Sequence, residues 1–206
     1  MISSTGPAQA LDGSRIDGGL YTDVTEFARH THWLNQAMVW WTGYGAVLFV
    51  LLLVAGWWVA RRGGAAMMAG ALAGFAAAAV SYLVNSGIKD VFTEPRPCRA
   101  LPHDFLLEAC PAPSDYAFPS NHTTVAFAAA VAVLMIHRGL GALGLAAAVL
   151  MAFSRVYVGA HYPHDVLVAA LVGSLVAVLC VSIGRRFGGP AVQRLQSGPL
   201  RPLLTT

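Results

Sequence analysis

Charge is scarce in this sequence, and lysine is scarcer still. Only 11% of the 206 residues are charged while 56% are hydrophobic, and Lys89 is the one lysine among 13 basic residues. This balance is too apolar for an ordinary water-soluble domain of the same length. A formal net charge of +3 without a lysine-rich face also excludes a nucleic-acid partner. We therefore expect an integral membrane protein whose first partner is the bilayer.

Cysteine is scarce as well. Cys98, Cys110 and Cys180 are too few and too irregularly spaced for a zinc cluster or a disulfide framework. Cys98 and Cys110 share one polar segment between hydrophobic runs, where they would form a disulfide if that segment faces an oxidising compartment. Two free thiols are an equally good interpretation. Cys180 lies in a hydrophobic run and is assigned to packing.

Hydrophobic runs, by contrast, are abundant. A helix needs roughly 20 residues to cross a hydrocarbon core about 30 Å thick. Residues 39–60 and 65–88 meet this length clearly, and residues 120–137, 141–158 and 164–184 form three shorter or interrupted runs. The sequence therefore predicts an all-α fold, a polytopic transmembrane helix bundle of five spans.

A further helix is expected before the first span. Apolar residues fall there at roughly helical spacing among polar ones: Val24, Phe27, Ala28, Leu34 and Met38. This pattern is typical of an N-terminal helix lying in the membrane interface, with a short re-entrant segment as the alternative. We divide the chain into a flexible N-terminus (1–20), a membrane domain (21–186) and a cytoplasmic tail (187–206).

Basic and acidic residues separate along the predicted topology. Arginines occupy two short loops and the tail, which must share one face: Arg61, Arg62, Arg138, Arg185 and Arg186. That face should be cytoplasmic. All ten acidic residues, and the polar segment 89–121, then lie on the opposite side. We predict a protein of the cytoplasmic (inner) membrane with its polar segment facing the extracytoplasmic side.

Three polar clusters stand where hydrophobic runs begin or end. They are KDVFTEPRP with Lys89 and Arg96, FPSNH with Ser120, Asn121 and His122, and SRVYVGAHYPHD with Arg155, His161 and Asp165. The topology places all three at one membrane face. A charged side chain at the bilayer centre costs roughly 2.5 to 3.5 kcal/mol, so these residues should line a wet pocket or the interface.

The pattern resembles the type 2 phosphatidic acid phosphatase family of the phosphatase and haloperoxidase superfamily. The family signature reads Lys, six residues, Arg-Pro; then Pro-Ser-Gly-His; then Ser-Arg, five residues, His, three residues, Asp. Every fixed position matches except Asn121, which replaces the usual Gly, and the resemblance covers about residues 65–185. Asn adds a Cβ and an amide, which narrow the pocket or add a donor.

The resemblance implies a role for each matched residue. His161 attacks phosphorus, Asp165 orients its imidazole, and His122 protonates the leaving oxygen and then activates water. Five residues are expected to bind phosphate, through cationic side chains or through amides at a helix start: Lys89, Arg96, Ser120, Asn121 and Arg155. On this interpretation residues 21–186 are a membrane phosphatase domain.

No metal or other cofactor is expected, because three cationic side chains supply the positive charge. A metal site made of His161, His164 and Asp165 is a weaker alternative, since those cations would repel a divalent ion. His164 belongs to no family position and is interpreted as a solvated interfacial residue. The remaining acidic residues of the polar segment are interpreted as solvated loop charges: Glu94, Asp104, Glu108 and Asp115.

The resemblance further implies a metal-independent lipid phosphatase that acts at the extracytoplasmic face through a phosphohistidine intermediate. The compact form is similar to bacterial undecaprenyl pyrophosphate phosphatases, which serve cell-wall synthesis. Hydrolysis of phosphatidylglycerophosphate, phosphatidate or another polyprenyl phosphate, lipid phosphotransfer, and non-catalytic anion transport are the alternatives. The sequence leaves open which lipid phosphate is the substrate and whether the chain forms a homo-oligomer.

Overall fold

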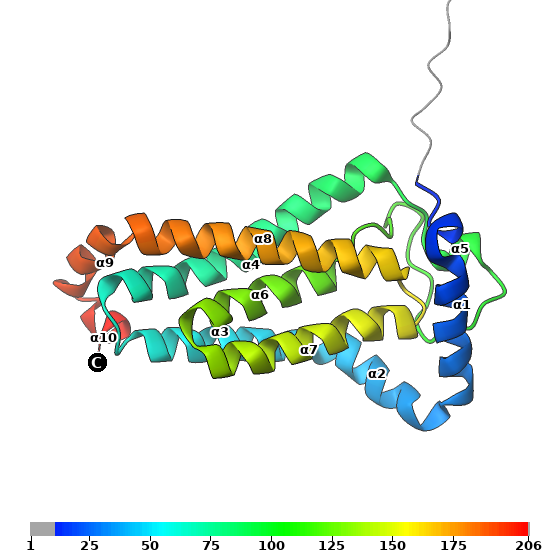
Figure 1. Cartoon of the computed structure of the whole chain (residues 1–206), viewed down its shortest axis with the longest axis horizontal. Coiled ribbons are helices and arrows are strands. Elements are labelled where there is room, and N and C mark those ends of the chain that lie inside the picture. The colour runs from blue at the N-terminus through cyan, green and yellow to red at the C-terminus, as the bar shows by residue number, and fades with distance from the viewer. Residues whose placement is uncertain (1–10, 206) are drawn as a thin grey trace, which may run out of the picture.

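The computed structural model describes residues 11–205, which fold into ten helices and no strand (Figure 1). The helices are α1 (Ser14–His30), α2 (His32–Tyr44), α3 (Ala46–Ala60), α4 (Ala65–Phe92), α5 (Pro97–Ala100), α6 (Asn121–Ile136), α7 (Arg138–Tyr157), α8 (Pro163–Phe187), α9 (Gly189–Gln196) and α10 (Arg201–Leu204). The predicted all-α class is confirmed for this part of the chain.

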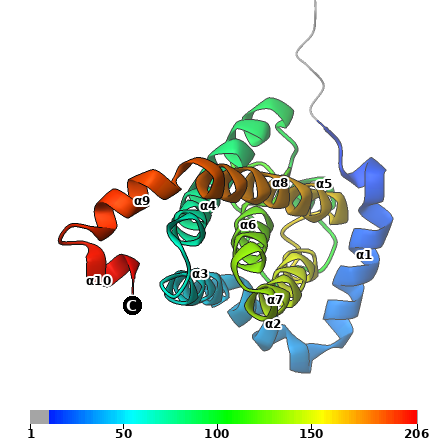
Figure 2. The same ribbon diagram turned by 60° about the vertical axis from the view of Figure 1, so that its left-hand side comes forward.

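Helix α6 forms the centre of the bundle, and α3, α4, α7 and α8 pack around it (Figure 2). Its buried positions are mostly small: Ala126, Ala128, Ala129, Ala130 and Ala132. Small side chains let neighbouring helices approach closely without a polar contact between them. The core of the bundle is therefore built around an alanine-rich helix.

Glycines set the closest approaches to α6. A Cβ built on Gly173 of α8 would lie 2.1 Å from the carbonyl oxygen of Thr124, and one on Gly141 of α7 would lie 2.1 Å from the Cα of Leu134. No side chain fits at either contact. The start of α8 is thereby held against the start of α6, where the Ser120 amide donates to the Asp165 carbonyl at 3.4 Å.

Within residues 11–205, three helical stretches are long and apolar enough to cross a membrane: Ala65–Ala100, which contains α4, Arg138–Tyr157 and Pro163–Phe187. Helices α2 and α3 meet at a bend of 51° and make a fourth crossing if they count as one span. The predicted single run of residues 39–60 is therefore broken at Gly45, where Trp41 and Met151 leave no space for a Cβ. Helix α6, with 16 residues, is shorter.

The outer faces of these helices are apolar. Large hydrophobic side chains stand exposed along α4, α7 and α8, among them Leu72, Leu83, Leu143, Leu167, Leu171 and Leu179. A water-soluble monomer rarely exposes so much contiguous apolar surface, whereas lipid tails solvate it. The exposed faces and the helix lengths both indicate a membrane setting.

Helix α1 lies across the end of the bundle at which α7 ends and α8 begins (Figure 1). It buries Tyr21, Thr25 and Ala28 against that end. The helix begins at Ser14, so the prediction of an irregular segment up to residue 20 is wrong for residues 14–20. Their sequence is polar, but packing of one face on the bundle stabilises a helix that propensity alone would not. Residues 1–10 of that prediction lie outside the described part.

The chain after residue 187 folds back at the opposite end as α9 and α10. Val192 and Leu204 are buried there beside Ala60 and Met68. Arg61 secures the turn, because its Nη2 donates to the carbonyl oxygens of Pro202 at 2.7 Å and Thr205 at 3.1 Å. The segment predicted as a tail is therefore packed on the bundle.

Candidate active site

The structure brings the three sequence motifs together at the end of the bundle that α1 covers. Lys89 lies in the last turn of α4, Ser120 immediately precedes α6, and Arg155 lies in the last turn of α7. His161 stands in the loop between α7 and α8, and Asp165 in the first turn of α8. Four helix ends thus contribute to one site.

His161 is buried and held at both ring nitrogens. Its Nδ1 lies 3.2 Å from Oδ2 of Asp165, and its Nε2 lies 2.8 Å from Nη1 of Arg96. The same Asp165 oxygen accepts the backbone N–H of Tyr162 at 2.9 Å, which fixes the carboxylate. A carboxylate on Nδ1 directs the lone pair of a neutral imidazole to Nε2, the nitrogen beside the guanidinium.

The electrostatic setting keeps this imidazole neutral. Burial is the main cause that holds the pKa of His161 well below 6.5, and the positive charges of Arg96, Arg155 and Lys89 lower it further. At neutral pH the ring is therefore unprotonated in the free protein. A nucleophile needs that form, because an imidazolium has no lone pair to offer.

The loop that carries His161 depends on a glycine. Gly159 has φ +84°, a left-handed conformation that side chains other than glycine rarely adopt. A Cβ there would also lie 2.5 Å from Leu106 and 3.2 Å from the hydroxyl of Tyr21. That hydroxyl donates to the Gly159 carbonyl at 3.0 Å, so α1 fixes the loop from outside.

Two of the predicted phosphate-binding cations are bound by a single loop residue. Arg96 donates from Nε to the carbonyl oxygen of Asp115 at 3.0 Å and from Nη2 to its Oδ1 at 2.8 Å. Lys89 lies 3.4 Å from the same Oδ1 and donates to the carbonyl oxygen of Tyr116 at 2.7 Å. Both cationic side chains are buried, so their positions are well defined before any ligand binds.

The third cation, Arg155, is arranged in a similar way. Its Nη1 donates to the hydroxyl of Thr42 at 2.5 Å and to Oε1 of Glu108 at 3.0 Å. Its Nε finds no hydrogen-bond partner among residues 11–205. Arg155 therefore keeps donor capacity for an anionic ligand.

Asp115 and Glu108 were predicted to be solvated loop charges, and both do lie in the loop with 47% and 32% of the side chain exposed, but the prediction missed their ion pairs. Each is paired with a cation of the site. Burial raises the pKa of Asp115, but the hydrogen bonds and charges of Arg96 and Lys89 outweigh it and lower the pKa below 3.8. The carboxylate is thus ionised and stands where an anionic ligand would meet the same cations.

The start of α6 departs in detail from expectation. Ser120 is the N-cap residue, as predicted, but its side chain makes no capping bond within the described chain and instead accepts from Thr123 at 3.2 Å. Asn121 accepts through Oδ1 from Nδ2 of Asn85 at 2.6 Å, so its amide is held by α4. His122 is exposed and forms no hydrogen bond with the described residues.

Comparison with known proteins identifies the family of this chain. The family model of the PAP2 superfamily matches residues 70–188 of the 206, a segment that contains all three motifs. The chain belongs to the PAP2 superfamily.

Several curated proteins are similar to this PAP2 chain. Undecaprenyl-diphosphatase BcrC of Bacillus subtilis is 31% identical over 164 residues, which are 79% of this chain and 78% of that protein. An undecaprenyl-diphosphatase of Sulfolobus acidocaldarius is 40% identical over 96 residues, 46% of each protein. The putative undecaprenyl-diphosphatase YbjG of Escherichia coli is 38% identical over 123 residues, 59% of this chain and 60% of that protein. The chain thus spans about half the length of the last two relatives.

Two crystal structures share the fold of this PAP2 chain. That of Aquifex aeolicus LpxE has a TM-score of 0.58 at 22% identity and covers 88% of this chain and 99% of the other. That of a PAP2 type phosphatidylglycerolphosphate phosphatase from Bacillus subtilis has a TM-score of 0.61 at 20% identity and covers 82% and 87%. At such identities the likeness shows the helical architecture alone.

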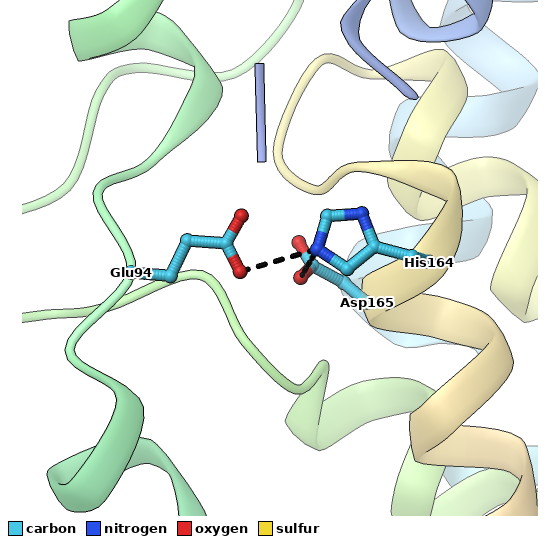
Figure 3. A group of neighbouring side chains, drawn as sticks. All are labelled: Glu94, His164 and Asp165. Carbon is cyan, nitrogen blue, oxygen red and sulfur yellow. Dashed lines mark hydrogen bonds and ion pairs between the residues drawn. The ribbon is translucent and has the colours of Figure 1, made fainter. Parts of the chain in front are cut away.

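A second polar cluster, which shares Asp165 with the PAP2 motifs, was not predicted from the sequence (Figure 3). Glu94, interpreted above as a solvated loop charge, is fully buried. His164, interpreted as a solvated residue, lies between Glu94 and Asp17 and is only 14% exposed. Both residues fall between the fixed positions of the PAP2 motifs, and that proximity was the available signal.

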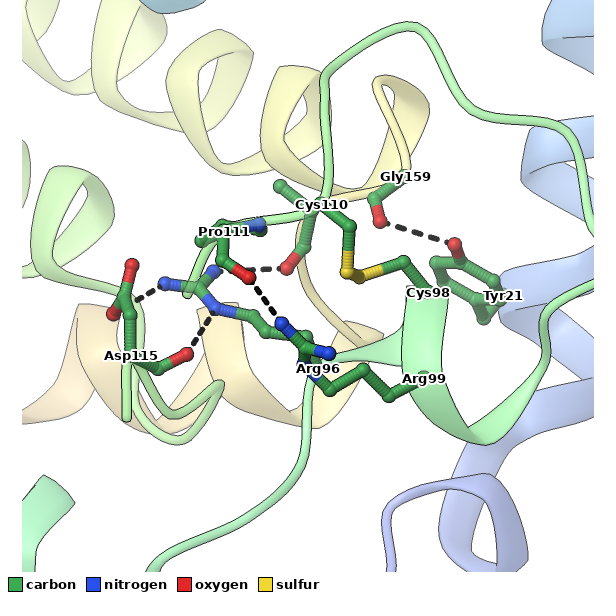
Figure 4. Close-up of a disulfide and its surroundings, with 9 residues drawn as sticks. Tyr21, Arg96, Cys98, Arg99, Cys110, Pro111, Asp115 and Gly159 are labelled. Carbon is green, nitrogen blue, oxygen red and sulfur yellow. Dashed lines mark hydrogen bonds and ion pairs between the residues drawn. A yellow bond between two sulfur atoms is a disulfide. The ribbon is translucent and has the colours of Figure 1, made fainter. Parts of the chain in front are cut away.

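A disulfide joins Cys98 and Cys110 in the structure, with their Cα atoms 5.9 Å apart (Figure 4). It ties α5 to the loop that leads to Asp115, and Arg99 donates to the carbonyl oxygen of Pro111 beside it. Of the two interpretations of these PAP2-loop cysteines, the structure has the bridged one. The bond restricts the segment that supplies Arg96 and Asp115.

An apolar cavity of about 270 Å³ adjoins the site of this PAP2 protein. Its walls come from α3, α4, α6 and α7 and include Phe49, Leu53, Ala78, Val125 and Met151. Asn121 and His122 also line it, so the cavity and the polar site share the start of α6.

Proposed function

We propose that this protein is an integral membrane lipid phosphatase that forms a phosphohistidine at His161, with undecaprenyl pyrophosphate as its substrate. One observation carries the proposal. The Nε2 of a buried neutral imidazole lies 2.8 Å from the Arg96 guanidinium, while Asp165 holds the opposite nitrogen. That arrangement suits a nucleophile beside a bound phosphate.

In the first step Nε2 of His161 attacks the terminal phosphorus, and the bond from phosphorus to the bridging oxygen breaks. The transferred group spreads negative charge over its equatorial oxygens, and Lys89, Arg96 and Arg155 are placed to neutralise it. These cations supply charge that other phosphatases draw from metal ions. His122 gives a proton to the leaving oxygen and then removes one from the water that cleaves the phosphohistidine.

The apolar cavity supports a lipid substrate. In hydrolysis of a lipid pyrophosphate the leaving group is the lipid monophosphate, so its hydrocarbon chain must emerge on the side of the general acid. His122 lines the cavity and follows Ser120 and Asn121 at the start of α6, which supports this requirement. The curated relatives named as undecaprenyl-diphosphatases favour this lipid over others.

We place the protein in the cytoplasmic membrane with five spans: α2–α3, α4, α6, α7 and α8. The 16 residues of α6 are about 24 Å long at 1.5 Å per residue, which falls short of the hydrocarbon core. Its neighbours shield it from lipid, so α6 need not cover the full thickness itself. The arginine-rich end would face the cytoplasm and the site the opposite side.

Phosphate release by purified protein tests the proposal. Undecaprenyl pyrophosphate should be hydrolysed faster than phosphatidylglycerophosphate or phosphatidate, and vanadate should inhibit. His161→Gln should reduce release to background, while His122→Gln should lose about 10²- to 10⁴-fold and keep a trace. His103→Gln, in the exposed loop, is the matched control and should hydrolyse at the original rate.

Quenching in alkali during turnover should leave acid-labile phosphate on the original protein and none on His161→Gln. Undiminished hydrolysis by His161→Gln would refute the proposed nucleophile. Transport of inorganic phosphate across the membrane of reconstituted vesicles, with no hydrolysis of lipid pyrophosphate, would instead support an anion transporter. Appearance of the phosphate on an added alcohol in preference to water would identify a phosphotransferase.

A further inference from the structure

Glu94, His164 and Asp165 bring one ligating atom each to a common point (Figure 3). Nε2 of His164 lies 3.2 Å from Oε2 of Glu94 and 3.5 Å from Oδ1 of Asp165, and one ligating atom from each residue lies within 4.8 Å of the other two. Ligands about 2.0–2.1 Å from a tetrahedral zinc ion stand about 3.3–3.4 Å apart, since a tetrahedron's edge is about 1.6 times its radius. The two measured spacings fit that edge.

The two carboxylates are buried and incompletely satisfied. Glu94 and Asp165 have no exposed surface. Oε1 of Glu94 and Oδ1 of Asp165 have no hydrogen-bond partner among residues 11–205. A buried carboxylate oxygen without a partner is strongly disfavoured unless a cation compensates it. Of the two, Oδ1 of Asp165 lies 3.5 Å from Nε2 of His164, while Oε1 of Glu94 belongs to the carboxylate whose other oxygen, Oε2, contacts Nε2.

The opposite nitrogen of His164 is held as in a metal-bound histidine. Oδ1 of Asp17, in α1, lies 2.8 Å from Nδ1 of His164. Oδ2 of Asp17 accepts a hydrogen bond from the backbone N–H of His164 at 2.7 Å. Phe118 and Tyr162 stack on the ring at centroid distances of 5.8 and 5.7 Å. A carboxylate that accepts Nδ1–H leaves Nε2 with its lone pair, the usual partner of a zinc ion.

From this geometry we propose that Glu94, His164 and Asp165 form a binding site for one Zn²⁺ ion, with Asp17 supporting His164 from behind. An imidazole ligand favours zinc over magnesium or calcium. In the sequence analysis, repulsion by nearby cations counted against a metal site. In the structure Arg96 is paired with Asp115 and Arg155 with Glu108, so their charges are partly neutralised. The 14% exposure of His164 leaves a path for the ion to enter.

A zinc ion at this site would affect catalysis by fixing the positions of Asp165 and Arg96. Asp165 presents Oδ1 to the metal side and Oδ2 to His161, so a bound ion would keep this carboxylate ionised and fixed. Glu94 precedes Arg96 closely in the chain, so the ion would also tie the Arg96 segment to α8. His164 and Glu94 would thus be positioning residues that act through Asp165.

Metal content tests the site directly. The full chain, purified through a tag without histidine, should contain about one zinc per chain by elemental analysis. His164→Gln and Glu94→Gln should lower this content at least tenfold. Asp17→Asn should weaken zinc binding about 10- to 100-fold, as expected of an outer-sphere carboxylate. His32→Gln, an exposed histidine on α2, is the matched control and should bind zinc normally.

A second measurement uses only the original protein, so its result does not depend on whether the variants fold. Protein stripped with chelator should regain zinc on titration with a higher Tm, and Co²⁺ should give the visible absorption of a tetrahedral complex. A stripped chain that takes up neither ion, or His164→Gln that binds zinc as the original does, would overturn the site. His164 would then be an imidazolium paired with Glu94.

Phosphate release from the same samples separates this inference from the proposed function. A chain that hydrolyses lipid but takes up no zinc would remove the metal site and leave the phosphatase. A zinc-loaded chain that releases phosphate from none of the lipids would remove the phosphatase and leave the site.

Discussion

At the scale of single residues, each cation of the site is paired with a carboxylate, and both carboxylates lie in the loop between α5 and α6. Asp115 bridges Lys89 and Arg96, and Glu108 meets Arg155. Burying a cation costs desolvation free energy, and a paired carboxylate offsets part of that cost. Each pair also fixes the position of its cation. If Lys89, Arg96 and Arg155 bind phosphate as proposed, these carboxylates compete with it, because the same donors must serve both.

We expect Asp115→Asn to make phosphate bind more tightly. The amide keeps the shape but removes a negative charge that faces Lys89 and Arg96, so inhibition by inorganic phosphate or vanadate should strengthen about 3- to 10-fold, after allowance for solvent screening. The Asp115 carboxylate itself should add no pH dependence between about pH 5 and pH 8, since its pKa is lowered below 3.8 and it stays ionised throughout; any change in the gain should follow the second ionisation of the phosphate.

Asp104→Asn is the control, because Asp104 accepts from Thr22 and lies in the same loop without pairing with a cation of the site. Inhibition constants for both variants can be measured with any hydrolysed substrate. Weaker inhibition in Asp115→Asn would mean that the carboxylate serves to orient the two cations and does not compete with the ligand.

The sequence predicts the residues of the motifs and misses their partners. Lys89, Arg96 and His161 stand at fixed spacings whose chemistry is local, so the pattern alone indicates them. Glu94 and Asp17 carry no such pattern, because their contacts exist only once α1 and the loop close over the start of α8. The same long-range closure decides whether Cys98 and Cys110 meet.

At the scale of helices, the contact between α6 and α8 positions the site. Gly173 permits the two backbones to touch, and at the ends of these helices Ser120 bonds with Asp165. Hydropathy predicted both helices to within a few residues, since long apolar runs are a strong signal. It could not predict the bend at Gly45, which follows from packing on Trp41 and Met151.

Gly173→Ala should destabilise the protein by about 1–3 kcal/mol, because its Cβ would overlap the Thr124 carbonyl and the helices must separate. Activity should fall with it, since the start of α8 carries Asp165. Gly87→Ala in α4 has no atom within 4 Å of its Cβ and should be neutral or stabilising by up to about 1 kcal/mol. Thermal unfolding in one detergent compares the two; equal Tm values would show that the helix contact is loose.

At the scale of the whole molecule, charge is distributed along the bundle. Arginines gather at the end that carries α9 and α10, and the described acidic residues lie at the end that α1 covers. A membrane protein with this asymmetry should insert in one orientation. The number of spans matters for this orientation. An odd number of spans, such as the five proposed, places the two ends of the chain in the bundle on opposite sides of the membrane.

A membrane-impermeant maleimide can report the orientation. Asp23→Cys on α1 should be labelled in intact cells, whereas Gly64→Cys, between α3 and α4, should react only after lysis. Both positions are exposed, and a Cys180→Ser background removes the thiol outside the disulfide. Labelling in the reverse order would turn the site toward the cytoplasm and leave its geometry unchanged.

The bond between Cys98 and Cys110 gives the protein a dependence on its surroundings. It restricts the segment between Arg96, which touches His161, and Asp115, which holds Arg96. In a reducing compartment this cross-link opens and the segment regains its conformational freedom. In the orientation proposed above, a newly made chain would therefore order this segment only after the segment reaches the oxidising side, and lipids of the cytosolic leaflet would be spared during its synthesis.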